Sequence, residues 1–187
     1  MPIGNSKHSI CVFCGSREGA SPAYVREAAR LGELIAAEGW RLVYGAGDIG
    51  LMGAVAHAAQ EAGAETFGVI PIHLLEKERG SRALGRFIVT EDMHERKKVM
   101  YMNSDAIVVL PGGAGSLDEF FEVLTWRQLG LHDKPILLLD TEGYWQPLVA
   151  LLDHVIAQGF ADASLRGYIT LVKDADSLVF ALRAAFS

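Results

Sequence analysis

The sequence predicts an α/β protein with a doubly wound, Rossmann-like and mostly parallel sheet that carries helices on both faces. Strand-like apolar runs alternate along the chain with stretches of helical periodicity, which is the order of a parallel sheet with crossover helices. Several runs are continuously apolar, as expected for strands that are buried on both faces. With 187 residues, 50% of them hydrophobic, the chain is expected to form a single domain over residues 1–187.

The first half of the chain is expected to alternate strands and helices. Strands are predicted over 9–13, 41–44, 65–70 and 86–89, and helices over 24–38, 51–62 and 91–103. Ser21 and Pro22 provide an N-cap and a first-turn proline for the first helix, and Gly39 ends it. Pro71 ends the third strand, and the charged, glycine-punctuated stretch 72–85 is predicted to be a surface loop or lid.

The second half continues the same order. Strands are predicted over 106–110, 135–139 and 168–172, and helices over 116–129, 145–158 and 174–186. Pro147 lies in the first turn of the second of these helices, and Gly159 ends it. No internal repeat or low-complexity segment appears in the sequence.

A glycine-rich turn lies between a buried strand and a helix at residues 110–119. Free backbone N–H groups and the positive end of the helix dipole lie at a helix start, and glycines let an anion approach them closely. One interpretation is therefore a phosphate cradle, with Glu119 one turn into the helix. The alternative is an ordinary strand-to-helix turn followed by an acidic residue.

The rest of the chain favours a binding site at this turn. Ligands of doubly wound sheets bind beyond the carboxyl ends of the strands, where the glycine-containing loops 15–17, 45–50 and 112–115 are expected. The predicted helix 91–103 runs antiparallel to the strand that follows it, so Arg96 and Lys97 near its start should lie at the same edge. Cations and backbone N–H groups together suit a phosphorylated small molecule.

A dinucleotide site is a weaker alternative. Gly45, Gly47 and Gly50 match the G-x-G-x-x-G pattern, but they follow the second predicted strand rather than the first. The next strand ends at Val69-Ile70-Pro71, without the acidic residue that would hold a ribose. The Walker pattern G-x-x-x-x-G-K-[ST] is also absent from the sequence.

The charge and hydropathy of the chain limit its partners. The net charge is −6, from 17 basic and 23 acidic residues, and no basic block is present, which argues against a nucleic-acid partner. No apolar run reaches the ~18–20 residues needed to span a bilayer, and residues 1–7 do not resemble a signal peptide. We therefore expect a cytoplasmic protein that binds neither nucleic acid nor membrane.

The cysteines and histidines do not suggest a metal site. Cys11 and Cys14 form a C-x-x-C pair, which could be a redox pair or half of a zinc site. The pair lies in and just after a predicted strand, and no second pair completes a metal site, so we expect ordinary buried or loop thiols. His57 and His73 lack metal-ligand spacing, and we expect no bound metal.

Four motifs point to a known family. Residues 111–119 (PGGAGSLDE) are similar to P-G-G-x-G-T-x-x-E, and residues 93–97 (MHERK) match M-H-x-R-K. Residues 44–53 (YGAGDIGLMG) are similar to Y-G-G-G-x-x-G-L-M-G, and residues 14–16 to an early C-G-S segment. In this order, and together with the predicted fold, they resemble the Lonely Guy family of cytokinin riboside 5′-monophosphate phosphoribohydrolases.

Three positions depart from the family pattern. Ser116 stands where threonine is usual, which keeps a hydroxyl group at the helix start. Ala46 replaces a glycine of the first loop, and Ala114 stands where plant members often have tyrosine. The change at Ala114 is expected to alter what surrounds the ribose or the base, whereas the arginine and the carboxylate of the family motifs are both retained.

The resemblance implies a nucleotide-binding domain that hydrolyses the N-glycosidic bond of a nucleoside 5′-monophosphate, N6-modified AMP or AMP itself. The products would be a free base and ribose 5-phosphate. Arg96 and Glu119 match the catalytic pair of the family. The implied substrate-binding positions are Gly15, Ser16, Gly45, Gly47, Glu78, Lys97, Gly113, Ala114, Gly115, Ser116, Leu117, Asp118 and Thr125. No cofactor is implied, and family members are usually homodimers, often with a site completed near the subunit interface.

The roles within the implied catalytic pair stay open at this point. Cleavage at the anomeric carbon develops oxocarbenium character, as in other glycosidases. Glu119 could stabilise that charge, hold the ribose hydroxyl groups or orient water, and Arg96 could bind phosphate or assist the departing purine.

Two other functions remain as alternatives. A non-catalytic carrier of a nucleotide or cofactor could use the same fold, because fold does not determine function. The label lysine decarboxylase has also been attached to such sequences, but that reaction normally needs a pyridoxal group on a Schiff-base lysine. Nothing in the sequence supports that chemistry.

Overall fold

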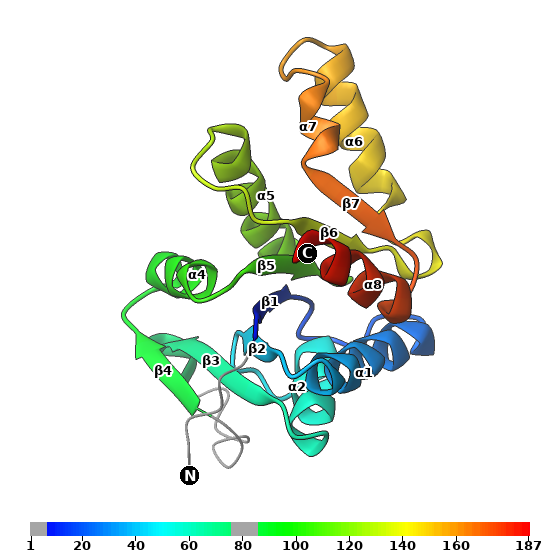
Figure 1. Cartoon of the computed structure of the whole chain (residues 1–187). Coiled ribbons are helices and arrows are strands. Elements are labelled where there is room, and N and C mark those ends of the chain that lie inside the picture. The colour runs from blue at the N-terminus through cyan, green and yellow to red at the C-terminus, as the bar shows by residue number, and fades with distance from the viewer. Residues whose placement is uncertain (1–6, 76–85) are drawn as a thin grey trace.

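A computed structural model describes residues 7–75 and 86–187, which build one seven-stranded sheet with parallel pairings throughout (Figure 1). The strand order is β4-β3-β2-β1-β5-β6-β7. The strands are β1 (Ser9–Phe13), β2 (Arg41–Tyr44), β3 (Glu65–Pro71), β4 (Arg86–Thr90), β5 (Ala106–Val109), β6 (Ile136–Leu139) and β7 (Ile169–Val172). The predicted doubly wound α/β fold is therefore confirmed.

Helices cover both faces of the sheet, with α1, α2 and α8 packed on one face and α4 to α7 on the other. They are α1 (Pro22–Ala37), α2 (Gly50–Glu61), α3 (Ile72–Leu75), α4 (Met93–Met102), α5 (Ala114–Gln128), α6 (Gln146–Ala157), α7 (Ser164–Gly167) and α8 (Ala175–Ala185). A 3₁₀ turn at Thr141–Gly143 leads into α6.

The sheet separates two hydrophobic cores, one on each face, and the central strands contribute to both because successive side chains of a strand point to opposite faces. In β1, Ile10 and Val12 belong to the core under α1, α2 and α8, whereas Cys11 and Phe13 belong to the other core. All residues of β5 are buried. A strand covered on both faces needs apolar residues at every position, which explains the continuous apolar runs in the sequence.

The signals for the start and end of α1 act as predicted. The Ser21 side chain accepts a hydrogen bond of 3.2 Å from the N–H of Ala23 and so caps the helix, with Pro22 as its first residue. Gly39 adopts a φ of 68°, which is the left-handed conformation that glycine tolerates best, and its N–H donates to the carbonyl of Ala36 at 3.0 Å.

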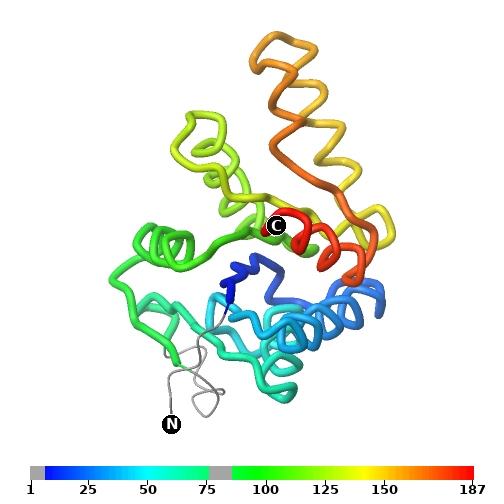
Figure 2. The backbone as a smooth tube through the Cα atoms, in the orientation of Figure 1, coloured from blue at the N-terminus to red at the C-terminus, as the bar shows by residue number. Residues whose placement is uncertain are grey.

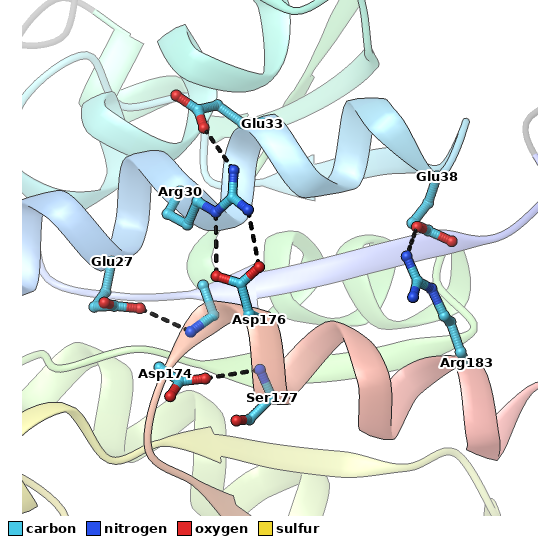
Figure 3. A network of polar contacts seen from close by, with 9 residues as sticks. Glu27, Arg30, Glu33, Glu38, Asp174, Asp176, Ser177 and Arg183 are labelled. Atoms are coloured by element: carbon cyan, nitrogen blue, oxygen red, sulfur yellow. Dashed lines mark hydrogen bonds and ion pairs between the residues drawn. The ribbon is translucent and has the colours of Figure 1, made fainter.

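The last helix, α8, lies beside the first helix, α1, so the C-terminal helix covers the same face of the sheet as α1 (Figure 2). Arg30 of α1 binds Asp176 with two hydrogen bonds of 3.2 and 2.8 Å, and Glu38 pairs with Arg183 (Figure 3). Glu27 accepts a hydrogen bond of 2.7 Å from the N–H of Ala175 at the start of α8. These polar contacts add to the apolar packing of α8, whose Leu178, Val179 and Leu182 are buried in the core.

All predicted strands and long helices occur, with ends that differ from the prediction by at most two residues. The short elements α3, Thr141–Gly143 and α7 were not predicted. Helix α3 begins the stretch 72–85 that was predicted as a loop or lid. The rest of that stretch, 76–85, lies outside the described residues.

The order of the strands determines where a ligand site can form. The chain passes from β1 to β2 on one side of the sheet and later enters β5 on the other side of β1. A crevice opens at the carboxyl ends of strands where the winding direction reverses, which here is at β1 and β5.

Candidate functional site

Three loops meet at this crevice and are hydrogen-bonded to one another through Gly15. The N–H of Gly15 donates to the carbonyl of Pro111 at 3.0 Å, and its own carbonyl accepts from the N–H of Met52 at 3.3 Å. A Cβ atom on Gly15 would lie 3.3 Å from the Cα of Gly112, so the loops after β1 and β5 pack closely. The three loops that sequence analysis placed at one edge of the sheet are therefore together.

A cavity of about 690 Å³ lies over these loops. Its volume is in the range of small-molecule sites. The residues that line it are Cys14, Gly15, Ser16, Arg17, Glu18, Gly19, Ala20, Tyr24, Leu51, Met52, Leu74, Met93, Arg96, Pro111, Gly112, Gly113, Ala114, Gly115, Ser116, Glu119 and Tyr144.

The start of α5 presents free backbone N–H groups to the cavity. Gly113 is the N-cap and has no side chain to bind the first N–H groups of the helix. A Cβ atom at Gly113 or Gly115 would meet no protein atom within 4 Å, so the packing of the protein does not explain these glycines. Gly112 differs, because a Cβ atom there would lie 2.1 Å from Ser116 Oγ. Open space at a positive helix end suits a bound anion.

Arg96 enters the site from the first turns of α4. Asp92 caps this helix, since its carboxylate accepts a hydrogen bond of 2.8 Å from the N–H of Glu95. The buried guanidinium of Arg96 donates from Nε to the carbonyl of Val69 at 3.1 Å and from Nη2 to the carbonyl of Gly45 at 2.8 Å. The carbonyl groups of Val69 in β3 and of Gly45 after β2 thus hold the guanidinium group, which also lines the cavity.

Glu119 enters the site from the second turn of α5. Its side chain is buried, and it lines the same cavity as Arg96. Burial raises the pKa of Glu119 to about 7, because the carboxylate loses hydration. The positive charge of Arg96 opposes this shift, and the negative charge of Asp118 adds to it. A carboxyl group that titrates near neutral pH can act in either protonation state.

Lys97 points away from the cavity and toward α5. Its ammonium nitrogen lies 2.9 Å from Asp118 Oδ2 and 2.9 Å from Glu122 Oε2. Lys97 and Asp118 were both expected to contact substrate, and neither is among the residues that line the cavity. The motif at residues 93–97 and the motif at residues 111–119 are thus joined directly by an ion pair.

The other expected substrate-binding residues fall into three groups. Gly15, Ser16, Gly113, Ala114, Gly115 and Ser116 line the cavity. Gly45 and Gly47 lie beneath it, because Gly45 supports Arg96 and the N–H of Gly47 donates to Met52 Sδ at 3.1 Å. Leu117 packs against the core, Thr125 is on the exposed side of α5, and Glu78 lies outside the described residues.

Several apolar and aromatic residues of the cavity were not predicted from the sequence. Tyr24 and Tyr144 lie with their rings perpendicular, 5.6 Å apart, and the Tyr144 hydroxyl donates to the carbonyl of Gly112 at 2.6 Å. Met52, Leu74 and Met93 add apolar surface. Helical periodicity marks such residues only as core candidates, so no sequence signal separated them from the core.

The two cysteines are buried, as the sequence favoured. Cys11 and Cys14 are free, buried thiols, and burial raises the pKa of both well above its ordinary value. His57 of α2 lies with Nε2 2.5 Å from Asp48 Oδ1. Among residues 7–75 and 86–187, no three His, Cys, Asp or Glu side chains are grouped so as to hold a metal ion. None of the helices within these residues is long and apolar enough to cross a bilayer.

Comparisons with known proteins agree with these motifs. Residues 52–182 match the family model described as "Possible lysine decarboxylase". The chain is 42% identical over 170 residues to the cytokinin riboside 5′-monophosphate phosphoribohydrolase LOG3 of Arabidopsis thaliana, covering 91% of this chain and 79% of the relative. It is likewise 42% identical over 175 residues to the Arabidopsis enzyme LOG5, covering 94% of this chain and 77% of the relative.

The fold has solved relatives of a different named function. A molybdenum cofactor binding protein from Rippkaea orientalis superposes with a TM-score of 0.73 at 25% sequence identity, covering 96% of this chain and 98% of that one. The sequence identity to the plant enzymes is much higher and extends over most of the chain. This chain therefore belongs to the Lonely Guy family, whose members carry the name cytokinin riboside 5′-monophosphate phosphoribohydrolase.

Proposed function

We propose that this protein hydrolyses the N-glycosidic bond of nucleoside 5′-monophosphates of the AMP type, including N6-modified AMP, and releases the free base and ribose 5-phosphate. One observation carries the proposal. Arg96 and Glu119, from two different helices, line a single cavity together with the open glycine start of α5. The named activity of the plant relatives agrees with it.

In the proposed complex, the phosphate binds at the start of α5. Gly113, Ala114, Gly115 and Ser116 would donate backbone N–H groups, and the helix dipole would favour the negative charge. Gly15 and Ser16 would close the other side of this subsite. The ribose would then lie beside Glu119 and Arg96, and the apolar side chains Met52, Leu74 and Met93 would contact the base.

Hydrolysis breaks the bond between the anomeric carbon and the base nitrogen, and the electron pair leaves with the base. Positive charge develops on the ribose, and the ionised carboxylate of Glu119 would stabilise it in a largely dehydrated site. A water oxygen then bonds to the anomeric carbon, and a water proton balances the charge on the departing base. Arg96 would hold the phosphate or the leaving base through the side of its guanidinium group that faces the cavity.

The first test is chromatography of products after incubation with AMP and, separately, with isopentenyl-AMP. We expect free base and ribose 5-phosphate from at least one substrate, and no release by the near-isosteric variant Glu119→Gln. The ratio of the two rates would determine the preference for an N6 substituent. A fully active Glu119→Gln variant would exclude the proposed role of this residue.

A carrier function is the second candidate, because the Rippkaea orientalis protein of similar fold is named for cofactor binding. A carrier would bind AMP in calorimetry without releasing base, and that result would replace the hydrolase proposal. Decarboxylation of lysine has less support, since no lysine is among the described residues that line the cavity.

We also propose a homodimer, as expected from the family resemblance. Phe121, Thr125 and Leu129 are exposed at intervals of four residues, so they share one face at α5 and its C-terminal end. This face would place Thr125 in the subunit interface. Light scattering on the protein eluted from a size-exclusion column should give twice the monomer mass, and the variant Leu129→Glu should give a lower mass. A monomeric wild type at micromolar concentration would exclude the dimer.

A further inference from the structure

Arg96 and Lys97 are consecutive residues of α4, but their side chains reach different partners. Arg96 is held by the ends of β2 and β3 and lines the cavity. The Lys97 side chain is only 5% exposed, and its ammonium nitrogen is 2.9 Å from carboxylate oxygens of both Asp118 and Glu122. These two carboxylates lie on α5 on either side of Glu119 in the sequence.

The network joins the two helices near the site. Helix α4 packs mainly on β3 and β4. The C-terminal end of α4 contacts α5, where the rings of Tyr101 and Trp126 lie 5.0 Å apart. At the end nearest the cavity, the contact is that of Lys97 with Asp118 and Glu122. The Lys97 side chain is buried, whereas Asp118 is 62% exposed and Glu122 is 24% exposed, so Glu122 is the more sheltered partner. Loss of both carboxylates would leave the buried ammonium group without a compensating charge.

The ammonium group stays charged in this setting. Burial alone would lower the pKa of Lys97, but the hydrogen bonds to Asp118 and Glu122 raise it above its usual value. Lys97 is therefore a permanent cation that is bound from the side of α5, away from the residues that would bind phosphate.

We propose that Lys97 is a positioning residue for the hydrolysis: by binding Asp118 and Glu122, it fixes the start of α4 against the start of α5 and so sets Arg96 against Glu119. This inference rests on the proposed function. It assigns Lys97 a role through its neighbours, in place of the direct substrate contact that its motif suggests.

The same network sets the charge around Glu119. The charged groups near its carboxylate are Arg96 and Lys97 from α4 and Asp118 and Glu122 from α5, and the thiols of Cys11 and Cys14 lie on the side of β1. Lys97 lowers the pKa of Glu119, whereas Asp118 and Glu122 raise it. Removing Lys97 should therefore raise the pKa of Glu119, and removing Glu122 should lower it.

The test compares kcat, KM and the pH dependence of base release for Lys97→Met, Lys97→Arg, Glu122→Gln and wild type. Lys97→Met should lower kcat about 100-fold with little change in KM, since small displacements of catalytic groups have effects of this size. Lys97→Arg should restore most of the rate, because it keeps a cation between the same carboxylates.

The pH profile distinguishes positioning from a general loss of structure. If ionised Glu119 is the active form, the rate should rise with pH around 7 in the wild type. The pH at which the rate rises, called the pH limb below, should move upward in Lys97→Met and downward in Glu122→Gln. The neighbouring Lys98 is exposed, so Lys98→Met serves as the matched control and should behave as wild type.

Several outcomes would overturn the proposal. A KM that rises 10-fold or more at unchanged kcat would make Lys97 a direct phosphate ligand, and an unchanged kcat and pH limb would exclude any role. If Lys97→Met does not fold, the opposite limb shift in Glu122→Gln and the rescue by Lys97→Arg still decide the matter. An inactive wild type overturns the proposed function as well, whereas an active wild type with an unaffected variant overturns this inference alone.

Discussion

Glu119 shows, at the scale of a residue, how a site can be costly to the fold. Its carboxyl group has a pKa of about 7 in the folded protein, against an ordinary value of 4.5. Between these two values the folded state binds the proton more tightly than the unfolded state, so the free energy of unfolding falls as pH rises. Above pH 7 the whole cost of burying the charge is present.

Glu119→Gln should therefore stabilise the protein at alkaline pH while abolishing turnover. We expect a gain of about 3 kcal/mol in the free energy of unfolding at pH 8, because the folded-state pKa of about 7 lies well above the ordinary 4.5 and a pKa difference of one corresponds to about 1.36 kcal/mol. The gain should vanish near pH 4, where both states are protonated. Urea unfolding of the two proteins at each pH checks this, and equal stability at pH 8 would mean that the carboxylate is well solvated.

Two glycines of the site should respond differently to alanine. A Cβ atom at Gly45 would lie 1.7 Å from Arg96 Nη2, so Gly45→Ala must displace the guanidinium group. We expect a loss of kcat/KM of about 100-fold, together with a lower melting temperature. At Gly113 the Cβ atom meets no protein atom within 4 Å, but it would enter the proposed phosphate subsite.

Gly113→Ala should consequently keep the wild-type melting temperature and weaken substrate binding about 10-fold, a loss of about 1.4 kcal/mol. Gly167, far from the site in α7 and equally free of neighbours, provides the matched control. Unchanged substrate affinity in Gly113→Ala would exclude phosphate binding at this position. Steady-state kinetics and thermal melts of the three variants measure both effects.

The residue types of the site could be predicted from the sequence, whereas the directions of their side chains could not. Arg96 and Glu119 were identified because their motifs have fixed spacing, and both line the cavity. The spacing did not reveal that Lys97 binds Asp118 and Glu122, because that depends on how α4 packs against α5. Tyr144 was missed for a similar reason, since it reaches Gly112 from a segment distant in sequence.

At the scale of an element, the best predictions came where one local signal was unambiguous. β5 and β6 were recognised because each is an unbroken apolar run, and α1 because a cap and a glycine mark its ends. The four-residue helices α3 and α7 were missed because one turn is too short to show a 3.6-residue period.

The ion pairs between α1 and α8 should contribute modestly and in a salt-dependent way. Arg30 and Asp176 are paired through two hydrogen bonds but are well exposed to solvent. Asp176→Asn should lower the melting temperature slightly at low ionic strength, and the difference should disappear at about 1 M salt. The control in thermal melts is Asp162→Asn, on the connection after α6. If Asp176→Asn lowers the melting temperature equally at all salt concentrations, the effect comes from the position of Asp176 in the first turn of α8 and not from its ion pair (Figure 3).

At the scale of the whole molecule, the parallel sheet brings distant segments to one cavity. Cys14, Arg96, Glu119 and Tyr144 come from four separate parts of the chain and meet at the carboxyl edge of the strands. This edge could be predicted from the sequence because, in a parallel sheet, the loops that follow the strands all lie at the carboxyl edge. The shape of the cavity, by contrast, depends on packing between elements and was not predictable from local pattern.

Because the site is assembled from most of the sheet, a ligand that fits it should stabilise the entire domain. Ribose 5-phosphate at 100 times its Kd should add about 2.7 kcal/mol to the free energy of unfolding. For a chain of 187 residues, this corresponds to a rise of roughly 5–10 °C in Tm. Thermal melts with ribose 5-phosphate and with unphosphorylated ribose measure the effect.

If the open N–H groups at the start of α5 bind the phosphate, as proposed, ribose should give little or no shift. Glu119→Gln should keep the shift with ribose 5-phosphate, since its carboxylate is not needed to bind an anion and its loss removes a negative charge from the cavity. Equal shifts with both sugars would place the main binding energy outside the α5 start, and the phosphate cradle would have to be abandoned. A shift that depends on the phosphate and survives Glu119→Gln would instead separate binding from chemistry, with the glycine turn serving the first and the buried carboxylate the second.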